Sequence, residues 1–259
     1  MYSFYQILFY FFIYSFLGWC CEVCFRSVNS GKFVNSGFLN GPYCPVYGFG
    51  MVAVILLLTP VQDNLPLLFV VSVAVTTVIE GLTGFALHKI FKTRWWDYTD
   101  MPFNYKGYVC LAFSLLWGLG AVFAIKLIHP AVAALVAWIN YKLGIVLLVI
   151  FSAAFAADGI ATVNILIKLN RDLGMLDDVA RRLKNQSNFI AQRLGNAAIK
   201  ADEVHDEMLL DLQAKQDMLR ADITDARIKR YYRIMRAFPS MKHDSYDEQL
   251  QLLRKKFVD

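Results

Sequence analysis

Three carboxylates lie in, or at the end of, apolar runs that are long enough to cross a lipid bilayer. They are Glu80 in the run 67–91, Asp158 in the run 143–168 and Glu22 at the end of the run 4–25. An acid at the bilayer centre costs about 2.5–3.5 kcal/mol on insertion scales, so a chain keeps one there only where it faces protein or water. These acids are therefore the candidate site, either a relay for protons or cations or a binding site for a cationic ligand group.

The side chains around Glu80 and Asp158 indicate that both acids face the interior of the protein. Residues three or four apart lie on one face of a helix. The face of Glu80 carries Thr76, Thr77, Thr83, Gly84 and His88, and that of Asp158 carries Ala154, Ala161 and Thr162. Faces of this kind pack against other helices, so we expect the acids to converge on one polar interior. The structural alternative is a hydrogen-bond network that ties the spans together, with one or more acids protonated. Glu22 fits that role best, because it lies nearer water and can pair with Arg26.

The elements that position the acids are predicted to be membrane-spanning helices. Five apolar runs have a suitable length and composition, at about residues 4–25, 47–62, 67–91, 108–128 and 143–168. A short interfacial helix is expected within residues 130–142. The predicted fold class is therefore all-α, with a polytopic transmembrane domain at residues 1–170 and a cytoplasmic helical tail at residues 171–259.

Lysine and arginine residues predict the orientation of these spans. The connections 26–46 and 89–107 are basic, and the residues responsible are Arg26, Lys32, Lys89, Lys92, Arg94 and Lys106. The turn 62–64 has no basic residue, and the connection 129–142 has only Lys142. We therefore expect a multi-pass protein of the cell membrane, with its N-terminus outside and its C-terminus in the cytoplasm.

The tail is predicted to be helical. Its second half has apolar residues at the spacing of a heptad seam, at Leu209, Leu212, Leu219, Ile223 and Ala226. Gly195–Asn196 is a predicted break, so the helices could fold back as a hairpin or pair between subunits as a coiled coil. Pro239 is expected to end the second helix, and an amphipathic segment at residues 246–257 closes the chain.

The remaining composition argues against several classes of protein. The net charge of +5 comes mostly from basic residues near membrane ends, so we expect no nucleic-acid partner. The five cysteines lack the paired C-x-x-C spacing of zinc sites and are interpreted as packing residues. We expect neither a metal nor a cofactor.

Two cytoplasmic connections are unusual for solvated linkers. Residues 35–50 read NSGFLNGPYCPVYGFG, and this proline, glycine and aromatic content predicts an irregular or re-entrant stretch packed into the membrane domain. Residues 94–100 read RWWDYTD, and their aromatic residues fit an interfacial belt. Arg94 could pair with Asp97, or it could reach a lipid phosphate or Glu22.

These motifs carry a resemblance to a known family. Their order is Gly18-Trp19 and Glu22, the 35–50 motif, the mid-span Glu80, Arg94-Trp95-Trp96-Asp97-Tyr98, and Asn104 with Gly107. Over about residues 5–170 this pattern resembles the bacterial family called putative ABC-transporter type IV, of CmpB type. Members typically have Arg where this chain has Ser36. The resemblance implies a bacterial membrane core of transport type, and with it we include Arg94, Asp97 and Asn104 among the candidate binding or coupling residues.

Three classes of function are compatible with these residues. The favoured class is an integral membrane transport protein or permease-like subunit, in which Glu80 and Asp158 couple a proton or cation. An ABC system would need a separate ATPase subunit, because the chain lacks the motif G-x-x-x-x-G-K-[ST]. Five spans are few for a pathway, so we expect a homo-oligomer in contact with membrane lipid.

The second class is a non-transporting scaffold or sensor whose tail recruits a cytoplasmic protein partner. The third class is an intramembrane enzyme acting on lipid, with a Glu or Asp as base and Arg94 on a phosphate. The single His88 near a membrane end gives this class little support, and we expect no enzymatic activity.

Overall fold

The computed structural model describes residues 2–194 and 225–257, which are mostly α-helical. The chain divides into two compact units. The first comprises Met1–Asn164 and Arg236–Lys242, and the second comprises Ile165–Met235 and His243–Asp259. This division differs from the predicted contiguous domains, because a short segment near the C-terminus belongs to the first unit.

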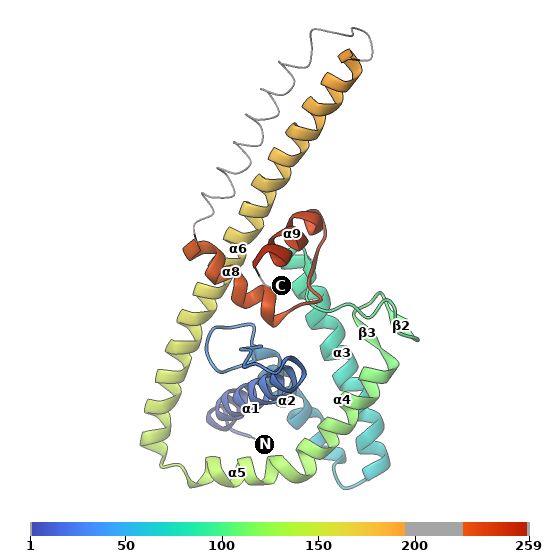
Figure 1. The fold of residues 1–259 in the computed structure, drawn as a ribbon. Helices are drawn as coiled ribbons and strands as arrows, with labels where there is room; N and C mark the ends of the chain where they lie inside the picture. The colour runs from blue at the N-terminus through green and yellow to red at the C-terminus, as the bar shows by residue number, and fades with distance from the viewer. Residues whose placement is uncertain (1, 195–224, 258–259) are drawn as a thin grey trace. The chain divides into compact units, whose positions relative to one another are not determined.

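The first unit consists of helices with short strands in one connection (Figure 1). Its helices are α1 (Phe4–Ser30), α2 (Pro45–Leu58) with the 3-10 turn η1 (Thr59–Val61), α3 (Leu65–Phe91), α4 (Leu111–Phe123) with the π-helical turn η2 (Ala124–Ile128), α5 (His129–Trp138) and the first part of α6 (Tyr141–Leu194). Its strands are β1 (Thr93–Arg94), β2 (Asn104–Tyr105) and β3 (Val109–Cys110), and β4 (Lys242–His243) lies at the boundary of the two units. Strands β2 and β3 pair antiparallel, with Asn104 opposite Cys110.

Local sequence signals explain where the first helices begin and end. Ser3 caps α1 by accepting a hydrogen bond from the backbone N–H of Gln6, whose side chain in turn accepts from the N–H of Ser3. Helix α1 ends at Gly31, whose φ of 65° is the left-handed conformation that glycine adopts without strain. Asn64 caps α3 by accepting from the N–H of Leu67 at 3.1 Å.

Four helices are long and apolar enough to cross a membrane, namely Phe4–Ser30, Leu65–Phe91, Leu111–Trp138 and the part of α6 at Tyr141–Arg182. The second predicted span corresponds to a shorter apolar helix, Pro45–Val61. The prediction of membrane-length helices is therefore confirmed for four of the five runs. The span predicted at 47–62 stays a prediction.

Most of the segment 130–142, where an interfacial helix is expected, forms helix α5 (His129–Trp138), which continues directly from α4 through η2, and Tyr141 and Lys142 begin α6. The interfacial position of α5 stays a prediction. Figure 1 shows the axis of α5 turned away from that of α4. Pro130 lies in the first turn of α5, where it can offer no backbone N–H to the preceding turn. A proline next to a π-helical turn is sufficient cause for a bend of this kind.

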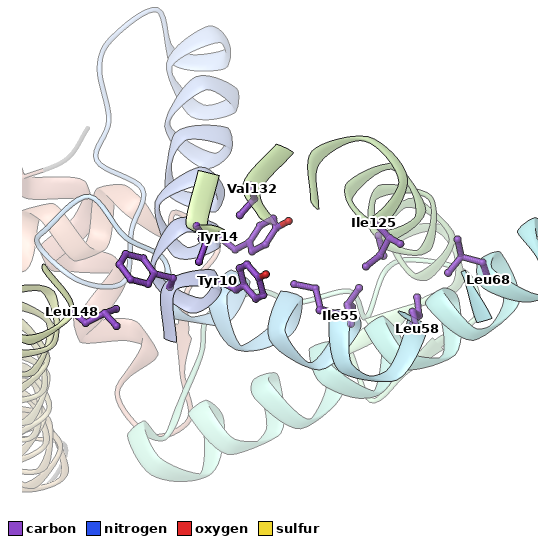
Figure 2. Packing of buried hydrophobic residues seen from close by; sticks show 12 residues of the cluster. Tyr10, Tyr14, Ile55, Leu58, Leu68, Ile125, Val132 and Leu148 are labelled. Atoms are coloured by element: carbon purple, nitrogen blue, oxygen red, sulfur yellow. The ribbon is translucent and has the colours of Figure 1, made fainter. Parts of the chain in front are cut away.

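The buried core of the first unit joins α1, α2, α3, α4, η2, α5 and α6. Figure 2 shows its aromatic and aliphatic side chains, among them Tyr10, Tyr14, Ile55, Leu58, Leu68, Ile125, Val132 and Leu148. Helices α1 and α2 approach closely, since a Cβ at Gly48 would overlap Ser15 and one at Gly18 would overlap the ring of Tyr47. Small residues at such crossings let backbones come together, which places α2 side chains directly on α1.

The second unit contains the rest of α6, most of α8 (Asp225–Ala237) and α9 (Asp247–Phe257). The buried Tyr231 donates a hydrogen bond to Asp172 at 2.7 Å, and Gln249 donates to Asp177 at 3.0 Å. Helix α8 ends two residues before Pro239, as predicted. The predicted break at Gly195–Asn196 and the seam residues Leu209, Leu212, Leu219 and Ile223 lie outside the described residues.

Candidate functional site

Glu80 on α3 lies at the centre of a small polar and aromatic group. One carboxylate oxygen, Oε1, accepts hydrogen bonds from the hydroxyl of Tyr98 at 3.1 Å and from the indole N–H of Trp117 at 3.2 Å. The other oxygen, Oε2, is buried and has no hydrogen-bond partner among the described residues. A buried carboxylate oxygen without a partner is costly, so this atom is the position where a proton or a bound cation would be stabilised.

Close packing of α3 on α4 brings Trp117 to Glu80. Gly118, the next residue on α4, lies so near Val73 of α3 that a Cβ would overlap its side chain. The glycine lets the two backbones approach, and the neighbouring indole then reaches across to the acid. The stripe predicted around Glu80 contributes less than expected, because Thr76 and Thr77 donate their hydroxyls to carbonyls one turn earlier in α3.

Glu22 lies in the same neighbourhood. Its Oε1 accepts a hydrogen bond from the hydroxyl of Tyr47 at 2.7 Å, and the ring of Tyr47 packs edge-on against Trp117 with centroids 5.9 Å apart. Among the described residues Glu22 forms no ion pair with Arg26, so the predicted pairing is wrong. A continuous series of side chains therefore runs from Glu22 through Tyr47 and Trp117 to Glu80.

The surroundings of Tyr98 keep its phenol protonated. Burial raises the pKa of the Tyr98 phenol well above its usual value, and the negative charges of Glu80 and Glu22 raise it further. Both acids thus act on one phenol, which remains protonated and able to donate. The ring of Tyr98 stacks on Phe113 of α4 with centroids 4.7 Å apart, and this contact fixes its direction.

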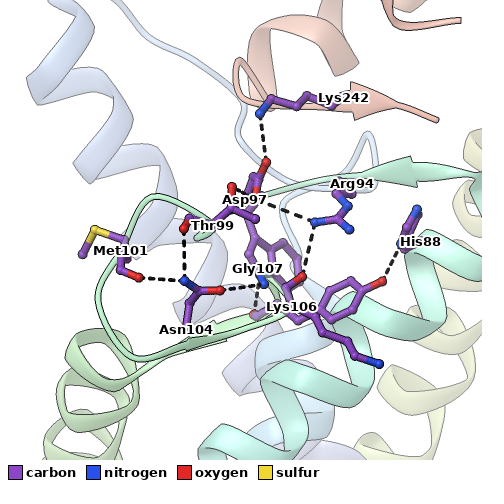
Figure 3. A network of polar contacts seen from close by, with 11 residues as sticks. His88, Arg94, Asp97, Thr99, Met101, Asn104, Lys106, Gly107 and Lys242 are labelled. Carbon is purple, nitrogen blue, oxygen red and sulfur yellow. Dashed lines mark hydrogen bonds and ion pairs between the residues drawn. The ribbon is translucent and has the colours of Figure 1, made fainter. Parts of the chain in front are cut away.

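A folded connection between α3 and α4 holds Tyr98 in place, and Figure 3 shows the hydrogen bonds of Asn104 within it. The side-chain amide of Asn104 donates to the carbonyls of Thr99 at 3.0 Å and Met101 at 2.8 Å, and its oxygen accepts from the N–H of Gly107 at 3.2 Å. The N–H of Tyr98 itself donates to the carbonyl of Gly107 at 2.9 Å. Asn104 therefore positions the loop and does not touch Glu80 directly.

Arg94 and Asp97 brace the same loop. Arg94 donates to the carbonyl of Lys106 at 3.2 Å, and its guanidinium lies 3.8 Å from Asp97, so the predicted ion pair is present. Burial alone would raise the pKa of Asp97, but hydrogen bonds from Lys242 and Thr99 outweigh it and lower the pKa to about 2. Asp97 is therefore a stable anion that organises the loop.

Asp158 on α6 lies in a different environment. Its Oδ1 accepts from the backbone N–H of Asn40 at 3.1 Å and from the Asn40 side chain at 2.7 Å, and its Oδ2 accepts from the N–H of Gly41 at 2.7 Å. Asp158 thus anchors the irregular connection 31–44, in which Leu39 and Cys44 are buried. Residues 45–50 of the predicted irregular stretch are helical instead and begin α2, because a proline such as Pro45 is well suited to the first turn of a helix. The hydrogen bonds of Glu80 and Asp158 lead to different connections, and the convergence of the two acids on one interior stays a prediction.

The aromatic residues of the second connection are not a simple interfacial belt. Trp95 is 4% exposed, and Trp96 donates its indole N–H to the carbonyl of Tyr108 at 2.9 Å. Tyr98 binds Glu80 as described above. The partners of the acids, Tyr47, Tyr98 and Trp117, were not among the predicted site residues. Tyr47 and Tyr98 lie within the two unusual motifs 35–50 and 94–100, and this position is the sequence signal that could have identified them. Nothing in the local sequence distinguishes Trp117.

The described residues contain no group of three or more His, Cys, Asp or Glu side chains that could hold a metal ion. Four membrane-length apolar helices, two of which carry the partly buried acids Glu80 and Asp158, indicate a helical membrane protein. A family model described as "Putative ABC-transporter type IV" matches residues 9–163, and the chain belongs to this family. Comparisons with curated proteins and with solved structures found no match.

Proposed function

We propose that the protein is an integral membrane transport protein or permease-like subunit in which Glu80 is the coupling site. The observation that carries this proposal is the asymmetry of the Glu80 carboxylate. One oxygen is held by Tyr98 and Trp117, while the other is buried without a partner among the described residues. Such a group can take up and release a proton or a cation while its orientation stays fixed.

Glu22 is proposed to act with Glu80 in the same polar pathway. Tyr47 and Trp117 connect the two acids. The hydroxyl of Tyr47 binds Glu22, the indole N–H of Trp117 binds Glu80, and the two rings pack against each other. Asp158 is proposed to support this site indirectly, since it holds the connection that leads into α2 and therefore into Tyr47. The coupling role that we predicted for Asp158 is thereby reassigned to positioning.

The proposed setting is a bacterial cell membrane, crossed five times, with the N-terminus outside and the C-terminus in the cytoplasm. Two contacts within the first unit are consistent with this orientation, because each joins residues that are predicted to lie on the same side of the membrane. Tyr2 at the N-terminus shares a hydrogen bond with His129 at the start of α5, and both are predicted to lie outside. Lys242 near the C-terminus pairs with Asp97, and both are predicted to lie in the cytoplasm.

A ligand screen by thermal stability tests the proposal. The melting temperature of the purified protein is measured over a range of pH and with added alkali cations or small organic ammonium ions. The wild type is compared with Glu80→Gln. A cation that stabilises the wild type and not the variant is the expected result, because binding to the folded state alone raises the melting temperature. Asp63→Asn is the matched control, since it removes one acid from an exposed turn. Equal stabilisation of wild type and Glu80→Gln by every cation contradicts the proposal.

The alternative function is a scaffold or sensor whose tail recruits a cytoplasmic partner. It is favoured by the compactness of the second unit, which has its own buried polar contacts at Asp172 and Tyr231. Deleting residues 171–259 distinguishes the two, because a scaffold loses its function while a transporter core retains ligand stabilisation. For an ABC system we propose a separate ATPase subunit, which would co-purify in mild detergent. We also propose a homo-oligomer, which the mass of the purified particle would reveal.

A further inference from the structure

The segment Arg236–Lys242 is part of the first unit although it lies far beyond the region that matches the family. Ala237 and Met241 within it are each 1% exposed, so the segment is packed and not a solvated linker. The residues on both sides of it belong to the second unit. A movement of the second unit would therefore pull on the segment from both ends.

Two contacts attach the segment to the connection between α3 and α4. The ring of Phe238 packs edge-on against the buried Trp95, with centroids 4.7 Å apart and an angle of 81° between the planes. The ammonium group of Lys242 lies 2.9 Å from Oδ2 of Asp97, as Figure 3 shows. One contact is apolar and the other is ionic, so the segment is held at two separate points.

Both contact points lie just before Tyr98, the loop residue that reaches Glu80. Trp95 and Asp97 are close in sequence to Tyr98, and Asp97 is its direct neighbour. Asp97 also accepts hydrogen bonds from the N–H and the hydroxyl of Thr99, at 3.1 and 2.8 Å. The carboxylate that binds Lys242 therefore sets the backbone around the phenol that donates to Glu80.

We propose that Arg236–Lys242 is a latch that holds the connection 92–110 with Tyr98 against Glu80. With the latch docked, Tyr98 occupies Oε1 of Glu80. When the latch withdraws, the loop loosens, and Glu80 becomes open to water or to another donor. The tail thereby controls access to the acid. The docking of the latch does not depend on the proposed function. Only the role of Glu80 as a coupling site rests on that proposal.

The test is made on the full chain in lipid nanodiscs. The latch variant is Phe238→Ala with Lys242→Ala. The matched control is Phe33→Ala with Lys255→Ala, which removes a 66% exposed phenylalanine and an exposed lysine elsewhere. Hydrogen exchange is measured over residues 93–110, and the rate at which a hydrophobic carbodiimide labels Glu80 is followed by peptide mass spectrometry.

In the latch variant we expect at least tenfold faster exchange of the loop amides and severalfold faster labelling of Glu80. Exchange in α3 and α4 should be unchanged, and Lys242→Arg alone should behave as the wild type. Unchanged loop exchange, an equal effect in the control, or loss of protection throughout α3 and α4 would each overturn the latch. None of these readouts needs transport, so a failed ligand screen with a positive latch result rejects the proposed function alone.

Discussion

The hydrogen bond from Tyr98 to Glu80 allows a direct test of the site. In Tyr98→Phe the hydroxyl is removed, but the ring keeps its stack on Phe113, so no large cavity forms. Trp117 still donates to the same oxygen at 3.2 Å. The variant therefore isolates one donor, the phenol at 3.1 Å from Oε1.

The size of the effect reports the charge of Glu80. A hydrogen bond to an ionised group contributes about 1.5–3 kcal/mol, and one between neutral groups about 0.5–1.5 kcal/mol. We expect Tyr98→Phe to lower the free energy of unfolding by about 1.5–3 kcal/mol at a pH where Glu80 is ionised. The loss should fall toward the lower range where Glu80 is protonated.

The assay is reversible unfolding in mixed micelles across a range of pH, made as a double-mutant cycle with Glu80→Gln. A coupling energy of about 0.5–3 kcal/mol is typical of groups in contact. Tyr105→Phe is the control, because its ring is 66% exposed in the same connection. A zero coupling energy, or an equal loss in the control, would refute the interaction that we assign to Tyr98 and Glu80.

Three further predictions concern the surrounding structure. The pKa of Asp97 is lowered from 3.8 to about 2, so its contribution to stability is complete above about pH 4 and is lost as the pH falls through 2. The protection factors of the loop amides, which correct for the intrinsic pH dependence of exchange, should fall over that window, and in Asp97→Asn they should stay constant there. Gly18→Ala should destabilise by about 1–3 kcal/mol because its Cβ meets a packed ring of α2, whereas Gly120→Ala, with open space around it, should be neutral in a thermal melt. Asn40→Ala should cost about 1.5–3 kcal/mol, since it removes a hydrogen bond to the carboxylate of Asp158, and equal melting temperatures for wild type and variant would contradict this.

Much of the architecture could be predicted from the sequence because a bilayer imposes strong local rules. A membrane-crossing helix needs a long apolar run, and this run is visible without knowledge of its neighbours. The predicted runs at 4–25, 67–91, 108–128 and 143–168 correspond to membrane-length helices. The run 47–62 forms only the short helix Pro45–Val61, so length alone did not confirm it.

The partners of the acids could not be predicted, because they come from segments distant in sequence. Glu80 meets Trp117 only because Gly118 lets α3 and α4 approach, and it meets Tyr98 only because the loop folds back over α3. Helical spacing suggested the threonines next to Glu80 instead. These threonines bond to their own helix, which a periodicity argument cannot detect.

The sequence by itself determined that this protein has apolar membrane-length helices, that it keeps acids within them, and that two connections are too aromatic to be linkers. These properties depend on composition and on neighbours within one helix turn. Only the tertiary structure decided that Glu22 and Glu80 share one aromatic and polar group while Asp158 anchors another connection. The physical reason is that a carboxylate's role depends on which donors reach it, and donors from other segments arrive only when the chain folds.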